Sequence, residues 1–233
     1  RRAHEATRDK ETNPFIHLYE KVLIPDEDWQ NYDVVGISII GISQIIPGLT
    51  LARLLKEKFP HLHITLGGPI FSVNSGQLLG HPEFFDDFCN SIVTFEGEEP
   101  LHRLLSALKA GDSLSTVPNL LHLDGREVVQ NKERVELRFE ELPGPTFDGL
   151  PMHDYLSPYP IIPVLQSRGC YWGKCTFCTH SFVYGHRYGK QKTHGMVDEL
   201  EALMKKYNTK YFTFSDEAVS PHSLNDVSEL MIE

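Results

Sequence analysis

Three cysteines stand within nine residues of this chain, in the run C-Y-W-G-K-C-T-F-C that contains Cys170, Cys175 and Cys178. The run follows the apolar residues 161–165, which we expect to form a buried strand. Three thiolates on one short loop at the end of a strand can hold a metal centre and leave part of it uncovered. The sequence therefore predicts a strand-and-loop unit that can carry a catalytic centre.

The composition limits the classes of protein to which the chain can belong. Its 233 residues are 40% hydrophobic, enough for one or two cores, and no stretch approaches the ~20 continuous apolar residues of a membrane helix. A formal net charge of −10 argues against broad binding to nucleic acid or to an anionic membrane. The charged opening segment does not resemble a signal peptide, so we expect a cytoplasmic protein. The chain opens without Met, which fits a piece of a longer protein.

The first half alternates short apolar runs with amphipathic helices. We expect strands at residues 33–40, 63–66 and 91–95, and helices that begin near Pro47 and Pro100. A further helix is expected around residues 15–23. This order predicts an open, doubly wound α/β sheet of the Rossmann-like, flavodoxin-like kind. Because such a sheet usually has five strands, we expect one or two βα units to precede Arg1.

The second half predicts a different arrangement. A hairpin is expected over residues 119–131 with its turn at Asp124 and Gly125, followed by a proline-rich connector. After the cysteines come a helix at residues 195–207 and a strand at residues 211–214. Strand, loop, helix and strand in this order are the opening of a β/α barrel. The predicted domains are residues 1–115, a connector at 116–159, and the start of a barrel at 160–233.

The cysteine loop has three interpretations. A structural zinc site could use the three cysteines and His180, although no second C-x-x-C knuckle is present. The thiols could instead be inert and buried, as we expect for the solitary Cys89. In the third interpretation, which we favour, Cys170, Cys175 and Cys178 hold three irons of a four-iron cluster and leave the fourth open.

Residues 158–217 resemble the start of a radical S-adenosylmethionine (SAM) enzyme, which binds a 4Fe-4S cluster through three cysteines after the first barrel strand. The spacing here is C-x4-C-x2-C, one residue longer than the usual C-x3-C-x2-C of that family. The resemblance implies that Phe177 contacts the adenine of SAM. It also implies that Ser215, Asp216 and Glu217 take the place of the motif that binds the SAM amino group.

The first half resembles the cobalamin-binding domain that precedes many such barrels. The similarity lies in the strand that ends at Ser38, in L-G-G-P after the second strand and in E-G-E-E after the third. The family's lower-ligand motif, D-x-H-x-x-G, does not occur in the 233 residues. If cobalamin binds, the resemblance implies contacts from five residues at these strand ends, namely Ser38, Gly67, Gly68, Gly97 and Glu98.

The resemblance implies a radical SAM enzyme that cleaves SAM reductively and starts radical chemistry, with cobalamin-dependent methyl transfer as one outcome. Its cofactors would be a 4Fe-4S cluster, SAM and cobalamin. Its partners would be a small-molecule or peptide substrate and an electron donor such as flavodoxin or ferredoxin. The alternative is a non-catalytic zinc-binding or interaction module, in which a structural zinc ion bound by the three cysteines and His180 stabilises the second domain.

Overall fold

The computed structural model describes residues 2–135 and 137–232. The chain divides into two compact units, Arg1–Val135 and Glu136–Glu233. Each unit has a hydrophobic core of its own, so each is described by itself.

The first unit is built on a five-stranded sheet in the order β1-β2-β3-β4-β5. Strands β1 (Val34–Ser38), β2 (His63–Gly67) and β3 (Ser91–Val93) run parallel, as the sequence predicts. Strands β4 (Leu120–Asp124) and β5 (Glu127–Gln130) form the predicted hairpin, and β4 pairs antiparallel with β3. The hairpin therefore continues the sheet and does not belong to the connector in which it was predicted. The remaining domain boundaries stay a prediction.

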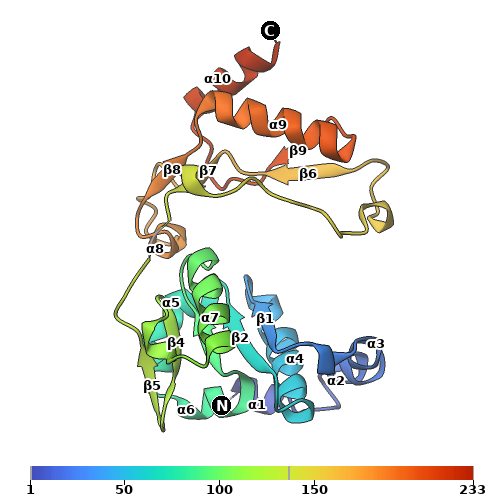
Figure 1. The fold of residues 1–233 in the computed structure, drawn as a ribbon, viewed down its shortest axis with the longest axis vertical. Helices are drawn as coiled ribbons and strands as arrows, with labels where there is room; N and C mark the ends of the chain where they lie inside the picture. The colour runs from blue at the N-terminus through green and yellow to red at the C-terminus, as the bar shows by residue number, and fades with distance from the viewer. Residues whose placement is uncertain (1, 136, 233) are drawn as a thin grey trace. The chain divides into compact units, whose positions relative to one another are not determined.

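Helices pack on both faces of this sheet (Figure 1). On one face, Leu49 and Leu55 of α4 (Ile45–Lys58) and Phe85 of α6 (Pro82–Phe88) share a core with Ile64 of β2. On the other face, Leu104 of α7 (Glu98–Ala110) packs with residues of β3 and β4. Burial on both faces explains the nearly continuous apolar runs of β2 and β3, whereas β1, at the edge of the sheet, is only partly covered.

Several shorter elements complete the first unit. The predicted helix around residues 15–23 is present as α2, which continues as a π-helical stretch, Tyr19–Leu23. Helices α1, α3, α5 and α6 have no counterpart in the sequence predictions. The bounds are α1 (Arg2–Ala6), α2 (Pro14–Leu18), α3 (Ile24–Asp26) and α5 (Pro69–Leu78), with 3-10 turns at Trp29–Asn31, Ile42–Gln44 and Leu114–Thr116.

The second unit contains the predicted strand, loop, helix and strand. Strand β6 (Ile161–Val164) pairs in parallel with β9 (Tyr211–Phe214), and α9 (Thr193–Tyr207) connects them. Ile162 and Val164 pack against Met196, Leu200 and other residues of α9 to form the core. A parallel pair joined by a helix is one β/α repeat, which agrees with the predicted start of a barrel.

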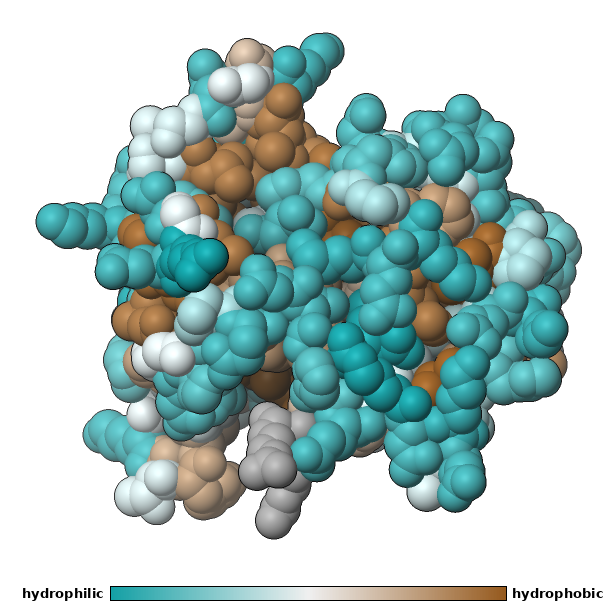
Figure 2. Space-filling view, turned by 90° about the horizontal axis from the view of Figure 1, so that it is seen from below, coloured by the Kyte–Doolittle hydropathy of each residue, from teal (hydrophilic) through white to brown (hydrophobic). Residues whose placement is uncertain are grey.

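An antiparallel pair, β7 (Ser167–Gly169) and β8 (Tyr188–Lys190), encloses the cysteine loop and the short helix α8 (His180–Val183). Helix α10 (Pro221–Ile232) follows β9, and 3-10 turns lie at Phe139–Glu141 and Met152–Asp154. No described helix is long and apolar enough to cross a membrane. On the face drawn in Figure 2, hydrophilic residues cover most of the surface and hydrophobic ones show in separate patches.

Candidate functional site

The three clustered cysteines lie on one loop between β7 and α8. Cys170 is half-buried, Cys175 and Cys178 are exposed, and all three are free thiols. Just before the loop, Gly169 has a φ of +87°, and a Cβ there would lie 2.1 Å from the carbonyl oxygen of Arg187. The close approach of β7 and β8 at the base of the loop therefore requires glycine.

In the structure, the three thiols are not arranged around a common position for a metal ion. Among residues 2–135 and 137–232, no group of three or more His, Cys, Asp or Glu side chains is arranged to hold a metal ion. The three thiols suit an iron–sulfur cluster, because they are soft sulfur ligands, form no disulfide and share one accessible loop. The assignment of these cysteines as ligands stays a prediction.

His180, the fourth ligand in the zinc interpretation, begins helix α8. Its Nε2 lies 3.3 Å from Oε2 of Glu217, but the two atoms lack hydrogen-bond geometry. Its ring packs against the ring of Tyr184, with the centroids 4.8 Å apart. These contacts account for the position of His180 and give the zinc interpretation no support.

The residues predicted to contact SAM have different surroundings. Phe177 is 87% exposed, so its ring is available to a ligand. The N–H of Ser215 donates to the carbonyl of Val164 and continues the pairing of β6 with β9. Glu217 is exposed beside His180. The SAM contacts of these residues stay predictions.

Asp216 has a task that the sequence did not reveal. Its carboxylate accepts hydrogen bonds from the backbone N–H of Gln166 at 3.1 Å, from the N–H of Ser167 at 2.6 Å and from Ser167 Oγ at 2.5 Å. These contacts fix the turn between β6 and β7, directly ahead of the cysteine loop. Asp216 thus connects the end of β9 to the base of that loop.

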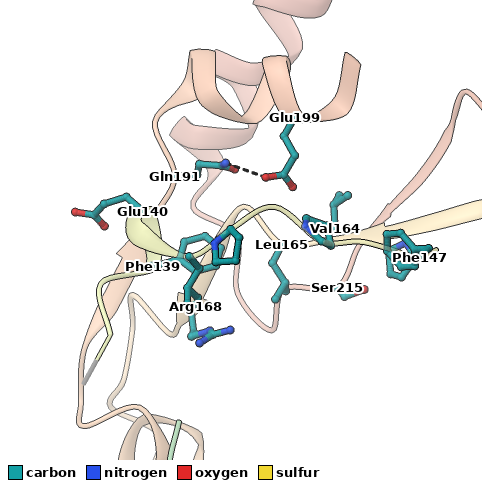
Figure 3. A pocket seen from close by; sticks show the side chains of 13 residues that line it. Phe139, Glu140, Phe147, Val164, Leu165, Arg168, Gln191, Glu199 and Ser215 are labelled. Carbon is teal, nitrogen blue, oxygen red and sulfur yellow. Dashed lines mark hydrogen bonds between the residues drawn. The ribbon is translucent and has the colours of Figure 1, made fainter. Parts of the chain in front are cut away.

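A pocket of about 380 Å³ lies beside the carboxyl ends of β6 and β9, and Figure 3 shows its lining. Apolar side chains, among them Phe139, Phe147 and Leu165, form most of the wall. Gln191 Nε2 donates to Glu199 Oε2 at 3.0 Å, and the buried Gln191 Oε1 has no hydrogen-bond partner among the described residues. An apolar wall with a few polar groups is typical of a small-molecule site.

A second pocket, of about 500 Å³, lies at the carboxyl ends of β1, β2 and β3 in the first unit. We call this pocket the crevice. All five residues predicted for cobalamin line it: Ser38, Gly67, Gly68, Gly97 and Glu98. A Cβ at Gly67 or Gly97 would make only ordinary contacts at 3.8 Å, whereas Gly68 has a φ of +108° and a Cβ there would lie 2.3 Å from the carbonyl oxygen of Ile39, so the backbone of the strand end requires glycine at residue 68. The structure brings these residues together, while their contact with cobalamin stays a prediction.

Phe95 also lines the crevice, and the sequence analysis did not single it out. Its backbone has a φ of +60°, in the left-handed region that favours glycine. Nothing in the sequence signals this conformation, because only the packing around the end of β3 imposes it.

Comparisons with known proteins agree with this architecture. No family model matches the chain. An uncharacterised methyltransferase of Pyrococcus horikoshii is 28% identical over 187 residues, which make up 79% of this chain and 39% of that protein. The anaerobic magnesium-protoporphyrin IX monomethyl ester cyclase of Rubrivivax gelatinosus is 23% identical over 224 residues, 89% of this chain and 38% of the cyclase. The chain thus spans about two fifths of the length of these relatives.

Two solved structures share the fold. The cobalamin-dependent SAM radical enzyme OxsB, with aqua-cobalamin and SAM bound, has a TM-score of 0.65 and 21% identity over 94% of this chain and 30% of its own. The radical SAM methyltransferase TsrM of Kitasatospora setae, with cobalamin and a [4Fe-4S] cluster bound, has a TM-score of 0.59 and 18% identity over 93% of this chain and 43% of its own. The predicted fold class, a Rossmann-like α/β domain followed by the first units of a partial β/α barrel, is confirmed, and it is the fold of these two cobalamin-containing radical SAM enzymes.

Proposed function

We propose that this chain provides the cobalamin-binding domain and the first part of the barrel of a radical SAM enzyme, with methyl transfer as its reaction. The observation that carries the proposal is the loop of three free cysteines, which follows β6, the first strand of a parallel β/α repeat, after the short strand β7. Two solved structures with this fold support it, since OxsB holds aqua-cobalamin and SAM, and TsrM holds cobalamin and a [4Fe-4S] cluster.

In this proposal, Cys170, Cys175 and Cys178 hold a 4Fe-4S cluster whose fourth iron is open to SAM. Bound there, the cluster would supply the electron for the reductive cleavage of SAM. Asp216 positions the loop by fixing the turn at residues 166–167. Phe177, Ser215 and Glu217 offer an aromatic face, a hydroxyl and a carboxylate for binding SAM.

The two pockets have separate tasks in the proposal. The crevice binds part of a corrinoid against the glycine backbone of the strand ends. The pocket of the second unit, with its mainly apolar wall, receives an uncharged portion of a small-molecule substrate or of SAM. The electron comes from an external donor of the flavodoxin or ferredoxin class.

Anaerobic reconstitution tests the cluster. We expect a brown protein with about four iron and four sulfide per chain and broad visible absorption. Cys170→Ala, Cys175→Ala and Cys178→Ala should each abolish cluster binding, because each thiolate is a ligand in the proposal.

The chain offers its own control in Cys89, which is 1% exposed in the core of the first unit. Burial raises the pKa of its thiol, so it is a poor metal ligand. Cys89→Ala should therefore leave the iron content unchanged. Stoichiometric zinc that persists in air, with no bound iron, would contradict the proposal.

A further inference from the structure

The crevice contains a conformational anomaly at Phe95. Strand β3 ends at Val93, and two residues later the backbone of Phe95 has a φ of +60°. Bulky L residues rarely adopt this conformation, and glycine adopts it without strain. Such strain persists where the surrounding structure enforces it, and it is concentrated at functional sites.

Two sets of hydrogen bonds enforce the conformation. The N–H of Phe95 donates to Ser72 Oγ at 2.7 Å. The N–H and the hydroxyl of the preceding Thr94 both donate to the carbonyl of Asn119 at 2.9 Å. Ser72 and Asn119 are buried, so the end of β3 is anchored from two sides.

Asn119 also anchors the segment that carries Arg134. Its N–H donates to the carbonyl of Glu133 at 3.0 Å, and its Nδ2 donates to the carbonyl of Val135 at 3.0 Å. The N–H of Val135 donates a hydrogen bond to Asn119 Oδ1 at 3.2 Å. One buried residue therefore holds Phe95 and Arg134 beside each other.

The guanidinium carbon of Arg134 lies 3.8 Å from the centroid of the Phe95 ring, which is a close cation–π contact. Phe95 lines the crevice and Arg134 is not among its lining residues. The guanidinium thus stacks on a ring that forms part of the wall. Of the described residues that line the crevice, Phe95 alone is aromatic, and glycine backbone and aliphatic side chains form much of the remainder.

We propose that Phe95 is a ligand-binding residue of the crevice, whose ring, stacked with Arg134, packs against a flat, conjugated ligand of the corrinoid class. The inference rests on the proposed function. A flat ring held rigidly loses little conformational entropy when a ligand packs on it. The resulting gain in affinity for the ligand explains why residue 95 is phenylalanine although its backbone conformation favours glycine.

The test measures the affinity of the full 233-residue chain for hydroxocobalamin by equilibrium dialysis, together with the absorption spectrum of the bound corrinoid and the thermal midpoint of each variant. Phe95→Gly removes the ring and suits the backbone conformation, so the fold should persist. We expect its affinity to fall about tenfold. Phe95→Asn, which also tolerates a positive φ, provides a second variant without the ring.

Further variants separate the effect of the Phe95 ring from that of the Arg134 charge. Phe95→Tyr keeps the flat ring and should bind within about twofold of the original chain. Arg134→Gln removes the guanidinium that stacks on the ring and should weaken binding about threefold. Arg126→Gln removes an equal charge from the exposed turn between β4 and β5, at the edge of the sheet opposite the crevice, and should leave the affinity unchanged.

The outcomes distinguish the two proposals. If the original chain binds hydroxocobalamin and the folded Phe95→Gly and Phe95→Asn variants bind it equally well, Phe95 is not a binding residue and the inference is overturned. If the original chain retains no hydroxocobalamin, the cobalamin part of the proposed function fails, and the inference fails with it. In that case the cluster proposal still stands on its iron content.

Discussion

At the residue scale, His63 at the start of β2 combines a buried environment with a polar contact. Its Nε2 lies 2.8 Å from Ser91 Oγ, which in turn donates to Thr65 Oγ1 at 3.0 Å. Burial, and then the charge of Lys56, lower the pKa of His63 from 6.5 to about 4. The histidine is therefore neutral in the folded protein at pH 7 and belongs to the core network of the sheet.

This low pKa predicts that the first unit loses stability in mild acid. Between pH 6.5 and pH 4 the unfolded chain binds a proton at His63 that the folded chain does not, so unfolding becomes easier as the pH falls. From pH 7 to pH 5 we expect a loss of about 1 kcal/mol, after allowance for the remaining contact of the side chain with water. Urea unfolding at the two pH values measures it. In His63→Gln this loss should be smaller, and an equal loss in both proteins would contradict the assignment.

Single residues of the candidate site differ in how far the sequence could predict them. The five crevice residues come together as expected, because the carboxyl ends of parallel strands share one edge of the sheet. The left-handed backbone of Phe95 was not predictable, because it depends on Ser72 and Asn119, which are distant in the sequence. Hydrogen bonds across such separations leave no local pattern.

At the scale of elements, the turn between β6 and β7 depends on Asp216 from the end of β9. We predict that Asp216→Ala destabilises the second unit by about 2–3 kcal/mol, because two backbone N–H groups and the hydroxyl of Ser167 lose their acceptor. Urea unfolding of the protein without cofactors measures the loss. Glu217→Gln, one residue along and exposed, should change the stability by less than about 0.5 kcal/mol. Equal stability of the two variants would show that Asp216 does not hold the turn.

The elements also show which structural signals are local. Strand β9 and helix α9 were predicted closely, because a short β-rich run and an amphipathic stripe are visible within one segment. The hairpin was also located correctly, but its pairing with β3 was missed, since register against a third strand depends on contacts outside the hairpin. The pair β7 and β8 was missed as well, because each has only three residues and the cysteine loop separates them.

At the scale of the whole molecule, the described part of the second unit has two β/α units, β6 with α9 and β9 with α10, and the chain spans only about two fifths of the length of its curated relatives. Within the described residues, β9 pairs only with β6, which leaves its other edge without a strand. An unpaired parallel edge invites association with other strands. In a β/α barrel, side chains from several strand ends together enclose the reacting centre.

We therefore predict that this chain, even with cluster and SAM supplied, does not couple SAM cleavage to substrate. A carbon radical needs a wall that excludes water and stray hydrogen donors, and two β/α units cannot enclose it. Binding of SAM can persist, because the cysteine loop, Phe177 and the end of β9 are present.

The measurement compares 5′-deoxyadenosine formation, with a strong reductant, between this chain and a version extended at its carboxyl end toward the length of its relatives. The extended version should show substrate-dependent turnover and this chain should show little. Equal substrate-dependent turnover by both would mean that two β/α units suffice to protect the radical, and that the remaining strands of a barrel are not needed for catalysis.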